Sequence, residues 1–298
     1  MGTAKTRAKL PYYYPFAFGE GRITVLSDGP LELGDPRENF LGVSPEMVSA
    51  MLHRNFLPEK TVTLEQNVPL VEINGRTILF DTGMGASKAF GPTTGRLLTS
   101  FREAGRDPAE VDVIVLSHAH IDHTGGICDE SGNLNFPNAL IFISETDFVD
   151  WTDGSKLGTG FEFQVANARR NLLPYKDRIF HFRDGEEFIP GVQAVHAPGH
   201  TLGHHCFLIQ SGSETLCFMG DLTHHHVLLM ERPWMEFKYD TDPQMSARSR
   251  TRVLDMLATD RIQVMSYHFA WPGAGHVSRE GDGFRYHQSA MQMLLNIP

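Results

Sequence analysis

Three histidines and an aspartate lie within six residues of one another near the middle of the chain. They are His118, His120, Asp122 and His123. Imidazole and carboxylate are ligands that zinc and similar divalent cations take in proteins. The β-branched run 111–116 before them is typical of a buried strand, so the cluster begins where a strand ends. A histidine-rich surface loop is the simpler interpretation of a single imidazole, but this spacing favours a metal site.

Alternation along an extended loop would point His118 and His120 the same way, which leaves Asp122 and His123 for a second ion. Three later apolar runs end in the same kinds of residue. They lead to His200, in a Pro-Gly turn, to Asp221 and to His268. One such ending is unremarkable. Four of them, all supplying ligands of the zinc type, favour metal binding.

The elements that must position these residues are strands in runs with helices between them. Asn74-Gly75 separates two apolar runs and predicts a hairpin, whose second strand leads into Asp81. Ser44-Pro45 predicts the start of a helix, and further helices are expected at 245–257 and 288–295. This order predicts two sheets with helices outside.

The composition is that of an ordinary globular protein. Of 298 residues, 41% are hydrophobic and 21% charged. The net charge of −10 argues against a nucleic-acid partner, and no apolar run is long enough to cross a membrane. Three cysteines without a C-x-x-C pair suit a reducing compartment. Because the amino terminus holds no complete signal peptide, we expect a cytoplasmic protein. Its expected partner is a small-molecule substrate.

The first twenty residues are basic and then aromatic. Such a segment cannot form a core alone, so we predict an arm, residues 1–20, that packs on the main domain or on a second subunit. The second alternative would imply a homodimer. Residues 21–298 contain no linker and are predicted to form one domain.

The motifs HAHIDH (118–123), APGHTLGH (197–204), Gly220-Asp221 and Tyr267-His268 together resemble those of the metallo-β-lactamase superfamily of dinuclear hydrolases. Asp81-Thr82-Gly83 matches as well, and the resemblance runs from about residue 21 to the end. It implies an α/β fold, a four-layer αββα sandwich of two mixed sheets flanked by helices. The site would lie at one edge of the two sheets.

The resemblance also implies two divalent cations, zinc first, although the same ligands accept Mn, Co or Fe. Carried over by position, the ligands are His118, His120 and His200 for one ion, Asp122, His123 and His268 for the other, and Asp221 between them. Asp81 would orient a ligand histidine from behind. A hydroxide bridging the ions would attack the substrate, because a metal ion lowers the pKa of water from about 15.7 toward about 7.

The carboxyl-terminal half resembles methyl parathion hydrolase and related organophosphate hydrolases most, and acyl-homoserine lactonases next. The predicted activity is therefore hydrolysis of an ester-like small molecule: a phosphotriester such as methyl parathion or paraoxon, a lactone or a carboxyl ester. Lactonases have a tyrosine three residues after the bridging aspartate, where this chain has His224, which weakens the acyl-homoserine lactonase alternative. His224 either donates a hydrogen bond to substrate or packs beside the site. It and Asp122 are the catalytic candidates.

Four aromatic residues are candidates for the wall of a substrate pocket. Phe269 and Trp271 directly follow a ligand, and Phe148 and Trp151 precede a loop rich in glycine. Ordinary core packing is the alternative for each of them.

Two further classes compete with the hydrolase. A metal-dependent oxidoreductase or sulfur dioxygenase on the same fold would hold redox-active iron. However, the oxygen-reducing di-iron relatives have glutamate at the position of His120, which favours hydrolysis here. A non-catalytic metal-binding module would turn over no ester, lactone or phosphotriester.

Overall fold

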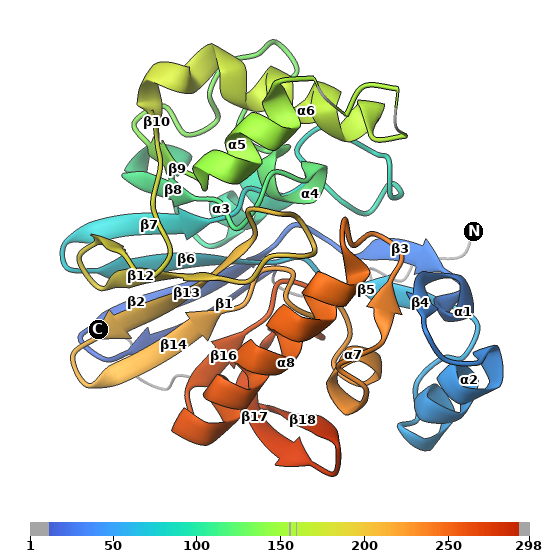
Figure 1. Ribbon diagram of the computed structural model, residues 1–298. Coiled ribbons are helices and arrows are strands. Elements are labelled where there is room, and N and C mark those ends of the chain that lie inside the picture. Colours follow the sequence, from blue (N-terminus) through green and yellow to red (C-terminus); the bar gives the residue numbers. More distant parts are fainter. Residues whose placement is uncertain (1–11, 155, 159, 292–298) are drawn as a thin grey trace, which may run out of the picture.

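The computed structural model describes residues 12–154, 156–158 and 160–291. Two large sheets lie face to face, with helices on their outer sides (Figure 1). Strands of both directions occur in each sheet. The predicted four-layer αββα sandwich is therefore confirmed.

The first sheet carries the amino-terminal half of the described chain. Its strands, in spatial order, are β1 (Tyr13–Phe18), β2 (Gly21–Ser27), β6 (Asn67–Ile73), β7 (Arg76–Phe80), β8 (Val113–Val115), β9 (Leu140–Phe142) and β10 (Ile179–Phe180). Antiparallel pairing runs from β1 to β7, and parallel pairing from β7 to β10. Asn74 and Gly75 both have positive φ, as a two-residue hairpin turn requires, so the predicted hairpin is confirmed.

The second sheet carries the carboxyl-terminal half. Its strands, in spatial order, are β11 (Glu187–Ile189), β12 (Val192–His196), β13 (His205–Ser211), β14 (Glu214–Phe218), β16 (Gln263–Met265), β17 (Ala274–Glu280) and β18 (Gly283–Gln288). The helix expected at 288–295 is wrong at its start, because Gln288 closes β18 against β17. Its remainder from residue 292 lies outside the described residues.

The helices lie outside the sheets. Those of the first half are α3 (Leu97–Glu103), α4 (Ile121–Thr124), α5 (Glu145–Thr152), α6 (Glu162–Leu172) and the 3-10 turns Pro108–Glu110 and Leu173–Arg178. The long helix α8 (Pro243–Asp260) packs on β17 (Figure 1). Asp242 caps α8 by accepting a hydrogen bond from the Met245 backbone N–H, and Pro243 occupies its first turn.

Short elements form a flank beside the site edge. They are α1 (Pro36–Asn39), α2 (Pro45–Arg54), α7 (Leu228–Glu231) and two small sheets, β3 (Leu31–Gly34) with β5 (Val62–Leu64), and β4 (Phe40–Leu41) with β15 (Glu236–Phe237). Ser44 caps α2 as predicted. This flank has a hydrophobic cluster of its own, which includes the fully buried Met51 and Leu229.

The main hydrophobic core lies between the two sheets. Phe80 of the first sheet packs against Phe207 and Phe218 of the second, with ring centroids 5.7 and 5.5 Å apart. Burial of this aromatic and β-branched surface is the main force that joins the layers. In the described part of the chain, no helix is both long and apolar enough to cross a bilayer.

The aromatic segment near the amino terminus is part of the first sheet. All six residues of β1 pair with β2. Backbone hydrogen bonding thus extends the first sheet into residues 13–18 of the expected arm, and this part packs on the main domain, the first of the two placements expected for it. Residues 1–11 of that arm lie outside the described residues.

Candidate metal centre

The predicted ligands meet at one edge of the sandwich. Each follows a strand: the cluster at 118–123 follows β8, His200 follows β12, Asp221 follows β14 and His268 follows β16. Gly220, just before Asp221, has a φ of +49°, and a Cβ there would lie 2.8 Å from the ring of His204. This turn therefore requires glycine.

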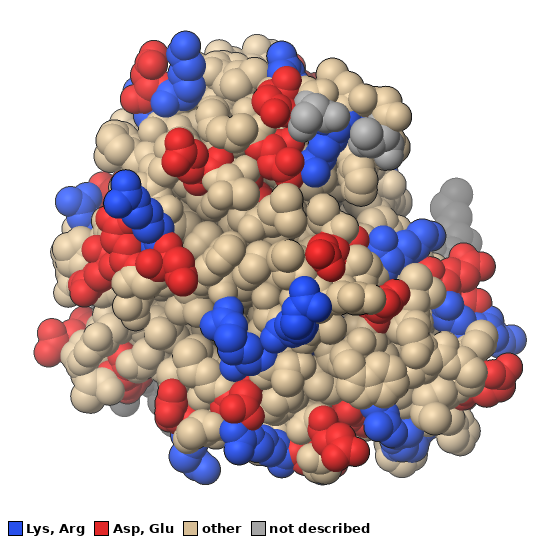
Figure 2. Space-filling model, in the orientation of Figure 1, with Lys and Arg blue, Asp and Glu red and all other residues tan. Residues whose placement is uncertain are grey.

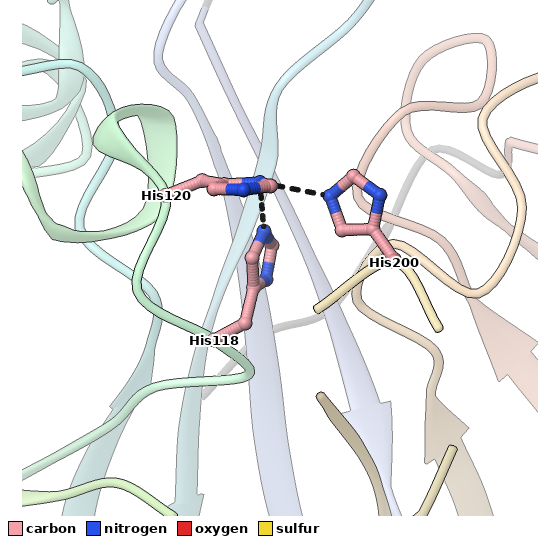
Figure 3. A group of neighbouring side chains, drawn as sticks. All are labelled: His118, His120 and His200. Carbon is pink, nitrogen blue, oxygen red and sulfur yellow. Dashed lines mark hydrogen bonds between the residues drawn. The ribbon is translucent and has the colours of Figure 1, made fainter. Parts of the chain in front are cut away.

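Three imidazoles form the first ligand group (Figure 3). The Nδ1 of His120 lies 3.0 Å from Nε2 of His118 and 2.9 Å from Nε2 of His200. His118 and His120 come from the loop after β8, whereas His200 reaches across from the second sheet. All three are buried. We call this set the three-histidine group.

Two histidines and two aspartates form the second ligand group. Its members are Asp122, His123, Asp221 and His268, with ligand atoms within 4.8 Å of one another. Asp221 joins the two groups: its Oδ2 lies 3.2 Å from Nε2 of His200 and 3.3 Å from Nε2 of His268. Its Oδ1 lies 3.3 Å from Nε2 of His123. We call this set the mixed group.

These residues fit a pair of cations. His123 Nε2 and Asp221 Oδ1 are both buried without a hydrogen-bond partner, which is costly unless something else satisfies them. Three imidazoles also converge in the three-histidine group, and their facing nitrogens could bind one shared cation. Nitrogen and carboxylate donors of this kind suit Zn²⁺ and related ions.

Buried acceptors fix the far side of several ligand rings. The carboxylate of Asp81 accepts hydrogen bonds from Nδ1 of His123 at 2.8 Å and from the Ser117 backbone at 2.8 Å. The Glu65 carbonyl lies 2.9 Å from Nδ1 of His268. Such acceptors set the tautomer and the direction of a metal-binding imidazole. Asp81 thus lies where the sequence expected it.

The sequence did not reveal two further carboxylates. Asp240 lies 2.9 Å from Nδ1 of His200, behind the three-histidine group. Asp147 accepts hydrogen bonds from the backbones of Ala119 and Gly203 and so joins two ligand loops. Each is a single acidic residue outside any motif. No signal in one sequence distinguishes such a residue from a surface carboxylate.

The protonation of the site follows from burial and from its carboxylates. Burial lowers the pKa values of His118 and His120 well below the ordinary value, so both rings are neutral and able to bind a cation. Burial also opposes charge on His200 and His268, but nearby carboxylates outweigh it and raise each pKa to about 9. Burial opposes ionisation of Asp122 too, yet His123 holds the pKa of that carboxyl well below its usual range.

A cavity of about 250 Å³ opens above both ligand groups. Its floor includes His120, Asp122, His200, Asp221 and His268. Its wall is largely apolar and comes from the flank, from the loop before α3, from the first turn of α6 with the loop before it, and from the segment between β15 and α8. The apolar members are Leu31, Leu33, Leu64, Phe90, Phe161, Phe163, Phe237 and Tyr239. None of these had been picked out from the sequence.

The four aromatic candidates lie elsewhere. Phe269 is fully buried in a hydrophobic cluster of the second half of the chain, where its ring contacts Tyr286. Trp271 and Phe148 pack against the main core. Trp151 is fully buried behind His120, with ring centroids 4.9 Å apart. The pocket assignment is therefore corrected for all four, and core packing describes them.

His224 lines the cavity between the ligand groups. Its Nε2 lies 2.9 Å from Oδ2 of Asp221, and its ring stacks on Phe237 at 3.9 Å. Burial lowers the pKa of His224 to about 4, so the neutral ring donates its one N–H to Asp221 and leaves Nδ1 as an acceptor. This geometry favours packing beside the site over hydrogen-bond donation to a substrate.

The fold and this site define a metallo-hydrolase class of structure. Residues 62–266 match the Metallo-beta-lactamase superfamily, which is more than half of the chain. The protein belongs to that superfamily.

Individual relatives narrow the comparison. The chain is 26% identical over 237 residues to an N-acyl homoserine lactonase of Bacillus thuringiensis, covering 71% of this chain and 84% of the relative. Among solved structures it is similar to AidC, a dizinc quorum-quenching lactonase in complex with a homoserine product. That match has 28% identity and a TM-score of 0.87, and it covers 94% and 98% of the two chains. The hydrolase AbOPH is similar too, with 27% identity, a TM-score of 0.89 and coverage of 96% and 100%.

Proposed function

We propose that this protein is a dinuclear metal-dependent hydrolase that opens lactone rings, with N-acyl homoserine lactones as its substrate class. The observation that carries the proposal is the pair of ligand groups sharing Asp221 at the floor of an apolar cavity. The sequence left a phosphotriester, a lactone and a carboxyl ester open. Two lactonase relatives, one from Bacillus thuringiensis and the other AidC, favour the lactone.

Zinc is the first choice of metal, because AidC is a dizinc enzyme and the ligands are imidazole and carboxylate. When bound, two such cations polarise an ester carbonyl and lower the pKa of water toward about 7. The three-histidine group would hold one cation and the mixed group the other, with Asp221 between them.

Asp122 is the candidate for proton transfer. Its carboxylate lines the cavity, on the side that a bound substrate would face. It can therefore accept a proton from the attacking water as the new carbon–oxygen bond forms. It then gives that proton to the ring oxygen when the ester bond breaks, which leaves a hydroxyl group and a carboxylic acid.

The apolar wall suits the acyl chain of the substrate. Aromatic and aliphatic side chains surround the space above the ligands, so a hydrocarbon chain would bury surface there at about 25 cal/mol per Å². The lactone ring, with its polar carbonyl, would face the floor. Chain length would then govern affinity more than the rate of ring opening.

A substrate panel tests the proposal. Purified protein with two zinc equivalents would be given N-acyl homoserine lactones of increasing chain length, simple lactones, an aryl ester and paraoxon, with acid release as the readout. We expect the acyl-homoserine lactones to have the largest kcat/KM. Turnover of paraoxon without any lactone turnover would contradict the lactonase assignment, and turnover of nothing would leave a metal-binding module.

Two expectations about the surroundings of the enzyme are retained as part of this proposal. The three cysteines are free and buried, which agrees with a reducing, cytoplasmic location. The homodimer stays a prediction, which the mass of the purified protein in solution would test.

A further inference from the structure

A fully buried arginine lies behind the three-histidine group. Arg250 sits on the inner face of α8, and its guanidinium donates to the carbonyls of Leu222, Pro233 and Met235 at 2.8 to 3.0 Å. It also donates to the Ser246 hydroxyl at 3.0 Å. A charged side chain is rarely buried without a specific role or a counterion.

The counterion is Asp240. One of its oxygens lies 3.4 Å from Nη2 of Arg250, and the other lies 2.9 Å from Nδ1 of His200. Both Arg250 and the Asp240 side chain are 0% exposed, so water does not screen this chain of contacts. Arg250, Asp240 and the ligand His200 therefore form one buried series of polar contacts.

Arg250 touches a second ligand segment as well. The carbonyl of Leu222 belongs to the residue directly after Asp221, which joins the two ligand groups. The hydrogen bonds from Arg250 to the carbonyls of Pro233 and Met235 hold the loop that leads to β15. Phe237 of β15 in turn stacks on the ring of His224. The guanidinium thus ties α8 to three segments around the site.

The mixed group is supported differently. Asp81 holds His123, but its other partners are the Ser117 backbone and hydroxyl rather than a cationic side chain. Among the described residues, the buried arginine–carboxylate series occurs only behind the three-histidine group.

We propose that Asp240 and Arg250 are a positioning pair that sets the cation affinity of the three-histidine group. Asp240 holds the ring of His200 with Nε2 toward its partners, and Arg250 fixes Asp240 while tying α8 to the site. This inference rests on the proposed dinuclear centre. It adds that Asp240 and Arg250 support the three-histidine group directly, whereas Asp81 supports His123 of the mixed group and reaches His118 only through the Ser117 hydroxyl.

Cation affinity, measured apart from activity, is the test. Zinc-free protein would be titrated with Zn²⁺ against a chromophoric chelator, as wild type, Asp240→Asn, Asp81→Asn and the double variant. We expect Asp240→Asn to bind one equivalent as tightly as wild type and the other about 10–100-fold more weakly. Asp81→Asn should weaken the other equivalent, and the double variant should weaken both.

Matched variants separate positioning from loosened packing. Asp242→Asn makes the same change two residues later, at the cap of α8, and should keep both equivalents tight. If Asp240→Asn does not fold, Arg250→Lys replaces it in the titration. Lysine keeps the positive charge but lacks the planar guanidinium, so the affinity for one zinc equivalent should fall by a smaller factor.

The outcomes are distinct. Two tight equivalents in Asp240→Asn, or equal weakening of both, would overturn the positioning pair and leave the proposed function standing. Wild-type protein that binds no zinc tightly would overturn both. Weaker binding of one zinc equivalent in Asp240→Asn, with both equivalents still tight in Asp242→Asn, would support the positioning pair.

Discussion

The floor and the wall of the cavity are built in different ways. The floor is made of imidazoles and carboxylates at strand ends, several held from behind by a buried acceptor such as Asp81 or Asp240. The wall is made of apolar side chains from the flank and from loops, and Phe163 in it is 45% exposed. The difference indicates that buried, hydrogen-bonded side chains determine the type of reaction. Partly exposed apolar side chains, which few specific contacts hold in place, determine the choice of substrate.

Removal of the carboxylate charge shared by the two ligand groups should disrupt the floor of the cavity and have the largest effect on activity. Asp221→Asn keeps the shape of the side chain but loses the carboxylate that faces four ligand histidines at 3.2 to 3.8 Å. We expect lactone kcat/KM to fall by about a thousandfold or more, because the site loses both cation affinity and preorganised charge. Acid release and bound zinc would be measured together.

Asp112→Asn is the matched control for this variant. Its carboxylate accepts from the Thr77 backbone, away from the ligands. It should retain wild-type activity, and a comparable loss there would show that the effect is not local to the floor.

Loss of one support should weaken the floor less than loss of a ligand. Asp81→Asn leaves His123 with a neutral acceptor, so kcat/KM at limiting zinc should fall by about 10–100-fold. Saturating zinc should restore part of that loss. An unchanged dependence of activity on zinc concentration would count against a role for Asp81 in orienting the ligand.

The floor should also respond to pH before any cation binds. His200 and His268 each have a pKa of about 9 in the metal-free protein, so each carries a proton at pH 7 that a cation must displace. Zinc affinity should therefore rise with pH up to about pH 9, by about tenfold per pH unit at the three-histidine group. The rise should be steeper at the mixed group, because carboxylates outweigh burial and also raise the pKa of His123 there. The raised pKa values of His200 and His268 stabilise the metal-free fold below pH 6.5, and that contribution is lost as pH rises through 9. Zinc titrations and unfolding curves from pH 6 to 9 would check both trends.

A change in the wall should have the smallest effect and should depend on substrate. Phe163→Ala removes part of the apolar surface, so KM for a long-chain acyl-homoserine lactone should rise about five- to tenfold with little change in kcat. A short-chain lactone should be affected less. Phe180→Ala is the control, since Phe180 is 46% exposed on β10 and outside the cavity. Equal effects of Phe163→Ala on long and short chains would contradict the assigned role of the wall.

The same contrast explains what the sequence could reveal. Ligand histidines and aspartates can be identified because a strand end fixes where a side chain points and because few residue types bind metal. The hairpin at Asn74 and the cap at Ser44 were predictable for a similar reason, since local backbone chemistry decides them.

The wall and the supports depend on contacts between distant segments. Phe269 follows a ligand yet points into the core, and Asp240 supports His200 from forty residues further along the chain. The helix expected at 288–295 fails at Gln288 because pairing with β17 overrides the local pattern. Such features require the fold itself, because no spacing in the sequence encodes them.

The central claim is that two cations at the shared floor are required for lactone hydrolysis. The direct measurement is acyl-homoserine lactone turnover by metal-free protein as Zn²⁺ is added back, with bound zinc determined at each step. We expect no turnover without metal and full activity at two bound equivalents. Turnover by protein shown to contain no metal, or full activity that never requires a second equivalent, would contradict the account.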